Sequence, residues 1–194
     1  MVAVRQLILV KHAAPDIIPT LPAHRWHLSA NGRQRCLPLA HLLASYCPAI
    51  VVSSREPKAA ETAAHVAAHL HISWRSGEGL HEHDRAQVPY LPREHFDRAV
   101  ADFFAHPDEL CFGQETAHQA CVRFHSAVSK MLSDTPTGNV IVIAHGTVIT
   151  LFVAYHTGLA AFPLWQRLGL PSFVVLTLPE FGLAEIVEDI AEDV

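Results

Sequence analysis

Two histidines in this chain each follow a run of aliphatic residues. The run 7–10 (LILV) leads through Lys11 to His12, and the run 140–144 (VIVIA) leads directly to His145. Aliphatic runs of this length, without alternating polar residues, are typical of buried parallel strands. Because ligands of α/β sheets bind at the edge where the carboxyl ends of the strands meet, we expect both imidazoles in one crevice, as a catalytic pair.

A histidine that attacks phosphorus needs cations beside the phosphoryl oxygens and an acid that protonates the leaving alcohol. Lys11 precedes His12 and is the first candidate cation. Lys58 is the second, since it begins a predicted helix whose N-terminus also attracts anions. Arg55 lies in the same turn and is a third candidate for phosphate binding. Glu82 is the candidate proton donor.

Strands and helices alternate along most of the chain. This order predicts a three-layer α/β/α fold with a mainly parallel sheet. Ser29 is the expected N-cap of the first long helix, and Pro38 is expected to kink that helix. The predicted strands are 7–10, 50–54, 71–74, 140–144, 171–178 and 183–187, and the predicted helices are 29–46, 57–70, 95–105, 116–132 and 148–157.

Residues 77–113 show no clear period outside one short helical segment. Insertions after parallel strands often carry specificity, so we expect this segment to select the substrate. It contains Glu82 and also Glu78, which is the nearest alternative proton donor. Earlier in the chain, Arg25 follows the first loop and is a candidate for binding a second anionic group of the substrate.

The chain has 194 residues, of which 50% are hydrophobic, and a formal net charge of −5. These values fit one domain over residues 1–194 with a full sheet-and-helix core. The negative charge provides no long-range attraction for nucleic acid or for an anionic membrane, and no apolar run reaches the roughly 18 residues of a membrane span. We expect a cytoplasmic protein whose acidic end, 188–193, is solvated. The apolar segment 152–165 fits either the core or a homodimer interface.

The 15 histidines raise the question of a metal site. His65 and His69 would share one face of a helix, and His81 and His83 flank Glu82. A zinc site needs three or four ligands at suitable spacing, and no such set is evident in the sequence. We therefore predict no metal and no cofactor.

Four motifs, in the right order, resemble those of the histidine phosphatase superfamily, also called the phosphoglycerate mutase-like family. The string KHA at 11–13 stands where the family has Arg-His-Gly or Arg-His-Ala, and SSREPKAAETA at 53–63 keeps the spacing of its second motif. The family's Leu-x-Glu setting falls on Glu82, and its late His-Gly falls on residues 145–146. The resemblance spans roughly residues 5–180.

This resemblance implies a phosphoglycerate mutase-like fold and metal-independent hydrolysis of a small phosphorylated metabolite. It implies that His12 is the nucleophile and becomes a phosphohistidine. Glu82 would donate the proton, and His145 would hold the phosphoryl group together with Lys11 and Lys58.

The sequence departs from the family at the two positions where arginine is usual, since both are lysine, Lys11 and Lys58. Arginine holds two phosphoryl oxygens in a planar fork, whereas lysine is a mobile point charge. Arg55 is expected to compensate from the same turn. The departures also leave open a catalytically weak or inactive protein that binds phosphorylated ligands. A phosphoglycerate mutase is the less favoured reading, because such enzymes usually carry a longer insertion.

Overall fold

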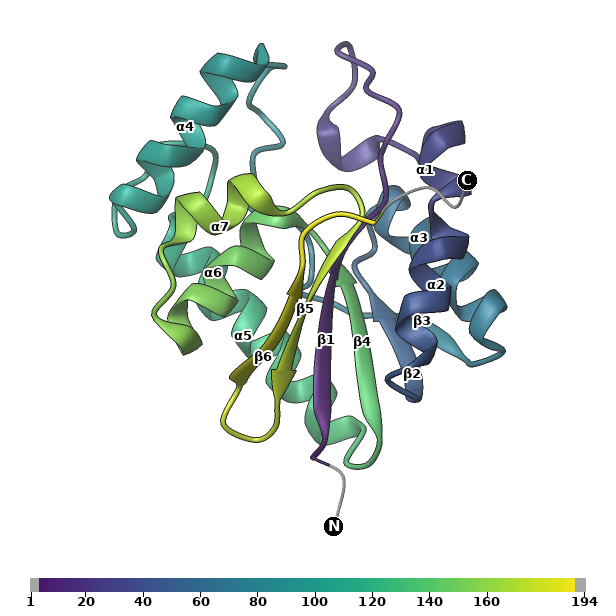
Figure 1. The fold of residues 1–194 in the computed structure, drawn as a ribbon. Coiled ribbons are helices and arrows are strands. Elements are labelled where there is room, and N and C mark those ends of the chain that lie inside the picture. Colours follow the sequence, from purple (N-terminus) through teal and green to yellow (C-terminus); the bar gives the residue numbers. More distant parts are fainter. Residues whose placement is uncertain (1–3, 191–194) are drawn as a thin grey trace.

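A mixed sheet with the strand order β3-β2-β4-β1-β5-β6 forms the centre of the molecule (Figure 1). The computed structural model describes residues 4–190. Strands β3, β2, β4 and β1 run parallel to one another, whereas β5 is antiparallel to both β1 and β6. This mostly parallel sheet confirms the predicted fold class. The strands are β1 (Gln6–Lys11), β2 (Pro48–Ser53), β3 (Trp74–Ser76), β4 (Asn139–Ala144), β5 (Ser172–Thr177) and β6 (Gly182–Val187).

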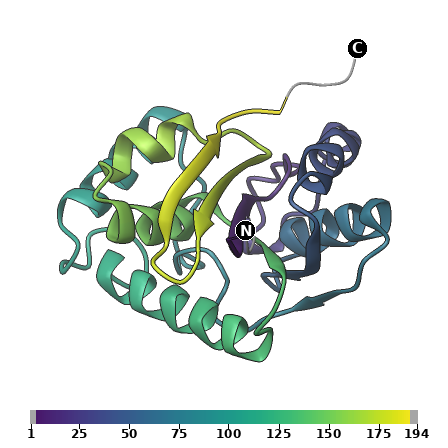
Figure 2. The ribbon, with the colours of Figure 1, turned by 60° about the horizontal axis from the view of Figure 1, so that its bottom comes forward.

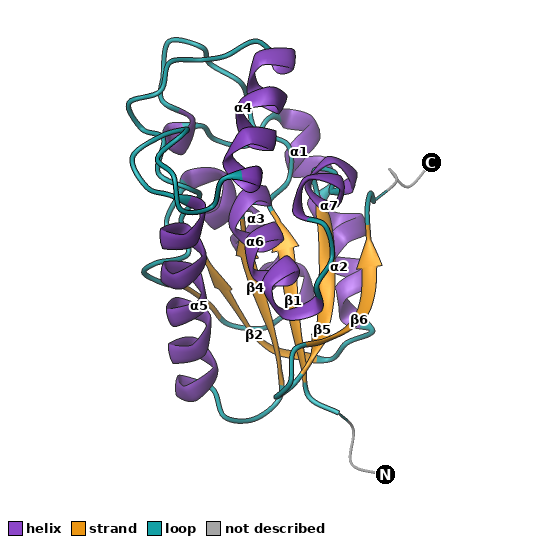
Figure 3. Cartoon of the chain, turned by 90° about the vertical axis from the view of Figure 1, so that its left-hand side faces the viewer, coloured by secondary structure: helices purple, strands orange, loops and turns teal. Residues whose placement is uncertain are grey.

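Helices cover both faces of the sheet (Figures 1 and 2). One group contains α1 (Ala30–Gln34), α2 (Cys36–Ala44) and α3 (Pro57–Leu70), preceded by the short 3-10 helix η1 (Ala23–Arg25). The other group contains α4 (Arg93–Ala105), α5 (Ala117–Asp134), α6 (Gly146–Thr157) and α7 (Ala161–Arg167), and it lies in front of the sheet in Figure 3. No helix within residues 4–190 is long and apolar enough to cross a membrane.

Alternate residues of β1 belong to different halves of the core. Leu7 and Leu9 pack in the cluster with α5 and α6, whereas Ile8 and Val10 pack in the cluster with α2 and α3. All four side chains are fully buried. A strand covered on both faces needs apolar residues at every position, which explains the unbroken aliphatic run.

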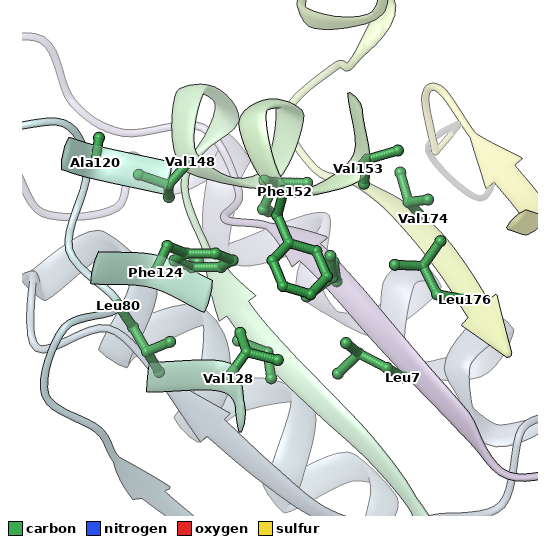
Figure 4. Close-up of a cluster of buried hydrophobic side chains, with 14 of the residues drawn as sticks. Leu7, Leu80, Ala120, Phe124, Val128, Val148, Phe152, Val153, Val174 and Leu176 are labelled. Atoms are coloured by element: carbon green, nitrogen blue, oxygen red, sulfur yellow. The ribbon is translucent and has the colours of Figure 1, made fainter. Parts of the chain in front are cut away.

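Phe152 on α6 lies at the centre of the first cluster, opposite Phe124 of α5 and beside Leu7 (Figure 4). Its side chain is fully buried, and its ring makes an edge contact with Phe124 at a centroid distance of 5.8 Å. We expect Phe152→Ala to lower the free energy of unfolding by about 3–5 kcal/mol, because the substitution leaves a cavity in a tightly packed core. Urea unfolding measures this change. The matched control is Tyr155→Ala on the same helix, where the side chain is 72% exposed; a similar loss in both variants would contradict the prediction.

The predicted helix 29–46 is two helices, α1 and α2, with the break at Arg35. The disturbance that we expected from Pro38 is present, but it lies at Arg35 rather than at Pro38 itself. Pro38 has no backbone N–H to donate to the carbonyl four residues earlier, at Gln34, and Gln34 is the last residue of α1. Ser29 is confirmed as the N-cap, since its Oγ accepts a hydrogen bond of 3.0 Å from the Gly32 backbone N–H.

Other predicted elements differ from the structure near their ends. The third strand begins at Trp74 rather than at 71, because His71 adopts the left-handed conformation that ends α3. Helix α7 was not predicted, since its residues read only as part of an apolar segment. At the acidic end, Glu188 and Asp189 form ion pairs with Arg167 and Arg35, and residues 191–194 lie outside the described part of the chain.

Candidate active site

The two predicted histidines meet at the carboxyl edge of the sheet. Strands β1 and β4 are parallel neighbours, with Lys11 in register with Ala144, so the next residues are His12 and His145. The His12 backbone N–H donates to the Ala144 carbonyl at 3.1 Å. The centroids of the two imidazole rings are 5.2 Å apart. In Figure 1 this edge is at the top of the sheet, below the loop that follows β1 and near α4.

His12 has the geometry of a nucleophile. Its Nδ1 lies 2.8 Å from the Ala13 carbonyl oxygen, and because a carbonyl only accepts, Nδ1 carries the hydrogen. The lone pair is therefore on Nε2. Burial, and then the neighbouring His145 and Lys58, lower the pKa of His12 well below its ordinary value. The imidazole is therefore neutral at neutral pH and can attack an electrophile.

His145 is fully buried, yet neither of its ring nitrogens forms a hydrogen bond with any residue in the range 4–190. Its Nε2 is 3.5 Å from Oε1 of Glu56. Burial and the charge of Lys58 lower the pKa of His145 well below the usual range. A buried imidazole without a hydrogen bond is costly, which indicates that a polar ligand completes this site.

Lys11 ends β1 and extends toward the loop before β5. Its Nζ donates to the Leu168 carbonyl oxygen at 2.6 Å, and burial lowers the pKa of Lys11 to about 8. Its stem passes close to Gly146, where a Cβ atom would lie 3.1 Å from the Cε of Lys11. A glycine after His145 thus leaves room for the lysine.

Glu82 belongs to the loop after β3, and its carboxylate lies against the N-terminus of α6. Its carboxylate accepts hydrogen bonds from the backbone N–H groups of Thr147 at 3.2 Å and Val148 at 3.3 Å, and from the N–H of His83 at 2.9 Å. Burial alone would raise the pKa of this carboxyl, but His145, Arg85 and the His83 N–H lower it overall. In the unliganded protein Glu82 is therefore a carboxylate.

The loop that carries Glu82 is held by Arg123 of α5. The Arg123 guanidinium donates to the carbonyl oxygens of Gly79 at 2.8 Å, His81 at 2.9 Å and Glu82 at 3.2 Å. It also forms an ion pair with Glu115. These contacts fix the loop relative to the sheet edge, so the position of Glu82 is set by the fold.

The family model of the histidine phosphatase superfamily (branch 1) matches residues 8–182. The chain belongs to this superfamily. No curated protein matches the chain in sequence.

Solved structures of low sequence identity share the fold. A mycobacterial glucosyl-3-phosphoglycerate phosphatase complexed with VO3 has a TM-score of 0.76 at 18% identity, with 95% of this chain and 98% of that chain covered. YhfR of Bacillus stearothermophilus has a TM-score of 0.76 at 20% identity, with 97% and 98% covered. Phosphoserine phosphatase of Entamoeba histolytica, in complex with 3-phosphoglyceric acid, has a TM-score of 0.75 at 16% identity, with 95% and 98% covered.

The second superfamily motif places Lys58 at the start of α3, with an acidic partner that our sequence analysis did not single out. The Lys58 Nζ donates to the Ala23 carbonyl oxygen at 2.8 Å and to Oε2 of Glu56 at 2.5 Å. The other oxygen of Glu56 accepts the Glu82 backbone N–H at 2.9 Å. Burial lowers the pKa of Lys58, although Glu56 opposes this shift. The sequence signal that could have identified Glu56 is its position just after the end of β2 and two residues before Lys58.

Two other residues that the sequence analysis proposed for the site lie further out. Arg55 forms an ion pair of 3.0 Å with Glu78, and both side chains are largely exposed. Arg25 belongs to η1 and lines an outer cavity of about 620 Å³, together with Arg55 and His81. The structure therefore groups His12, His145, Lys11, Lys58 and Glu82 and leaves Arg55 and Arg25 at the entrance.

An inner cavity of about 300 Å³ adjoins this group. Its lining includes Lys58, Glu56, Glu82 and Arg85, the last of which was not predicted. Within residues 4–190, no set of three or more histidine, cysteine, aspartate or glutamate side chains is arranged to hold a metal ion.

Proposed function

We propose that this protein is a metal-independent phosphomonoesterase that acts on a small phosphorylated metabolite through a phosphohistidine at His12. The observation that carries the proposal is the neutral, buried His12, whose Nε2 holds the lone pair beside His145, a ring that forms no hydrogen bond within residues 4–190. Membership of the histidine phosphatase superfamily supports it. Structural neighbours named as phosphatases of glucosyl-3-phosphoglycerate and of phosphoserine support the substrate class.

In the first step Nε2 of His12 attacks phosphorus, the P–N bond forms and the bond from phosphorus to the leaving oxygen breaks. Lys11 and Lys58 neutralise the phosphoryl oxygens, the neutral His145 donates a hydrogen bond to one of them, and Glu82 gives its proton to the leaving oxygen. In the second step water attacks phosphorus, the P–N bond breaks and Glu82 takes the proton from water. Glu82 then passes this proton to the departing phosphate, so inorganic phosphate is released and the enzyme returns to its starting state with Glu82 as a carboxylate.

Glu82 is a carboxylate in the unliganded protein. The proton that it donates to the leaving oxygen must therefore be brought into the site by the substrate. A phosphoryl group beside Glu82 brings negative charge next to the carboxylate, and like charges raise the pKa of a carboxyl. The same proton is then released toward the leaving oxygen as negative charge develops there.

Residues 77–113 and Arg25 remain our candidates for substrate selection. Arg25 and Arg55 line the outer cavity, so a leaving group with a second anionic group would find positive charge there. We propose that the preferred substrates carry such a group.

The test is hydrolysis of a panel of phosphomonoesters in the presence of EDTA, with inorganic phosphate as the measured product. The panel includes phosphoserine, 3-phosphoglycerate and p-nitrophenyl phosphate. We expect EDTA-resistant release of phosphate and an acid-labile, alkali-stable phosphoenzyme. Turnover that is lost with EDTA and restored by a divalent metal would contradict the mechanism.

The second candidate is a protein that binds phosphorylated ligands without turnover. The pairing of Lys58 with Glu56 favours it, because a lysine already neutralised by a carboxylate attracts phosphate less strongly. Binding of phosphate esters without any hydrolysis, in the presence or absence of metal, would favour this candidate over the enzyme.

The low pKa of Lys11 predicts the pH dependence of the free enzyme. Lys11 is charged below a pH of about 8 and loses its charge above it, so kcat/KM should fall as the pH rises through this value. Lys11→Arg keeps its charge over the whole range and is expected to remove this alkaline limb. The measurement is the pH profile of kcat/KM for both proteins. Superimposable alkaline limbs would show that another group causes the fall.

A further inference from the structure

The two lysines of the site already have partners, which limits the charge of Lys58 and the N–H donors of Lys11 that are left for a phosphoryl group. Lys58 pairs with Glu56, and Lys11 donates to the Leu168 carbonyl. Glu82 adds a second carboxylate. A phosphoryl dianion in this site needs at least one more cation, because charge developing on its oxygens must be matched by preorganised donors.

Arg85 is a half-buried arginine that lines the inner cavity together with Lys58, Glu56 and Glu82. Its guanidinium forms no hydrogen bond and no ion pair of its own with the residues from 4 to 190. It nevertheless acts on the site electrostatically, since its charge lowers the pKa of both Glu82 and His145. Arginine has five N–H donors in a planar fork that matches phosphate, so the unused donors indicate an anionic ligand.

Two contacts hold Arg85 in place: the Phe96 ring packs against its guanidinium, and a backbone hydrogen bond fixes the residue before it. Its Cζ lies 4.5 Å from the centroid of the Phe96 ring, a cation–π contact, and Phe96 packs in turn on Phe112 and Trp165. The preceding residue, Asp84, accepts the Gln114 N–H at 2.7 Å through its carbonyl oxygen. These contacts orient the arginine before any ligand arrives, which lowers the entropic cost of binding.

A glycine makes this backbone contact feasible. Gly113 has a φ of +94°, and a Cβ atom there would lie 2.3 Å from the Asp84 carbonyl oxygen. The segment that carries Arg85 is therefore packed directly against the loop before α5.

We propose that Arg85 is a catalytic residue that binds two oxygens of the phosphoryl group on the side of Glu82. It supplies the planar guanidinium fork that the lysines at positions 11 and 58 lack. The inference rests on the function proposed above, and it assigns this role to Arg85 in place of Arg55, which pairs with the exposed Glu78.

Arg85→Met tests this role, because methionine keeps an unbranched side chain over Phe96 and removes the charge and the fork. We expect kcat/KM for a phosphomonoester to fall by about 10²–10³-fold. Arg85→Lys keeps the charge and should recover only a small part of the loss. Added guanidinium ion should partly restore the activity of Arg85→Ala, a rescue that a structural role would not produce.

The matched control is Arg98→Met on α4, where the arginine is exposed and pairs with Glu94. It should keep the wild-type kcat/KM, and circular dichroism should show that all variants are folded. A folded Arg85→Met variant with wild-type kcat/KM and wild-type inhibition by orthophosphate and metavanadate would overturn the role of Arg85 and leave the phosphatase proposal intact.

Binding measurements separate this inference from the proposed function. If the wild type binds orthophosphate in calorimetry but hydrolyses no ester, the phosphatase proposal fails, and weaker phosphate binding by Arg85→Met than by Arg98→Met still supports Arg85 as a phosphate ligand. Equal phosphate binding by these two variants would overturn it. A wild type that neither hydrolyses esters nor binds phosphate would overturn both proposals.

Discussion

Replacing His12 with alanine is expected to lower kcat/KM for phosphomonoesters by about 10⁴-fold or more, because the chemical route through the phosphoenzyme is lost. The structure gives this residue a neutral ring, a free Nε2 and a position beside His145. Acid-labile, alkali-stable phosphate on the wild-type protein, measured after rapid quenching with a labelled substrate, should be absent from the variant.

The matched control for His12→Ala is His69→Ala on α3, which removes an exposed imidazole at the opposite end of that helix from Lys58. It should leave both turnover and phosphoenzyme unchanged. His12→Ala should still bind orthophosphate, since the cations remain. Turnover above a tenth of the wild-type rate in a folded His12→Ala protein would exclude His12 as the nucleophile.

Glu82→Gln is expected to lower kcat by about 10²–10⁴-fold for an ester with an alkyl leaving group. Glutamine has nearly the same shape but can neither donate a carboxyl proton nor accept one from water. With p-nitrophenyl phosphate the first step needs no proton donor, because nitrophenolate is a good leaving group. That substrate should therefore give a burst of about one nitrophenol per active site, followed by slow turnover as the phosphoenzyme accumulates.

Glu94→Gln on α4 is the control for this experiment, since Glu94 is exposed and pairs only with Arg98 among the described ion pairs. It should show wild-type rates with both esters. Equal losses of rate with the alkyl and the nitrophenyl ester, without a burst, would mean that Glu82 does not handle the proton. The exposed Glu78, paired with Arg55, would then be the next residue to replace.

The meeting of His12 and His145 at one sheet edge and the fold class could be predicted from the sequence by itself. A strand buried on both faces must be apolar throughout, so the runs before His12 and His145 are visible without any contact information. Caps are equally local: Thr116 accepts the Gln119 N–H at the start of α5, as Ser29 does at the start of α1. The superfamily motifs could also be recognised in the sequence, because each is a short string of residues and the strings follow one another in a fixed order.

Only the tertiary structure decided which arginine lines the inner cavity and which carboxylate pairs with Lys58. Arg55 is next to the motif in sequence, yet its side chain turns outward to Glu78. Arg85 reaches the cavity because Phe96, from a helix that follows it, lies under its guanidinium. Polar residues in loops have no periodicity, and the direction of each side chain is set by contacts with distant segments. The burial of the aliphatic strands can be inferred from their local sequence. The positions of the charged side chains around His12 depend on contacts between segments that are distant in the sequence.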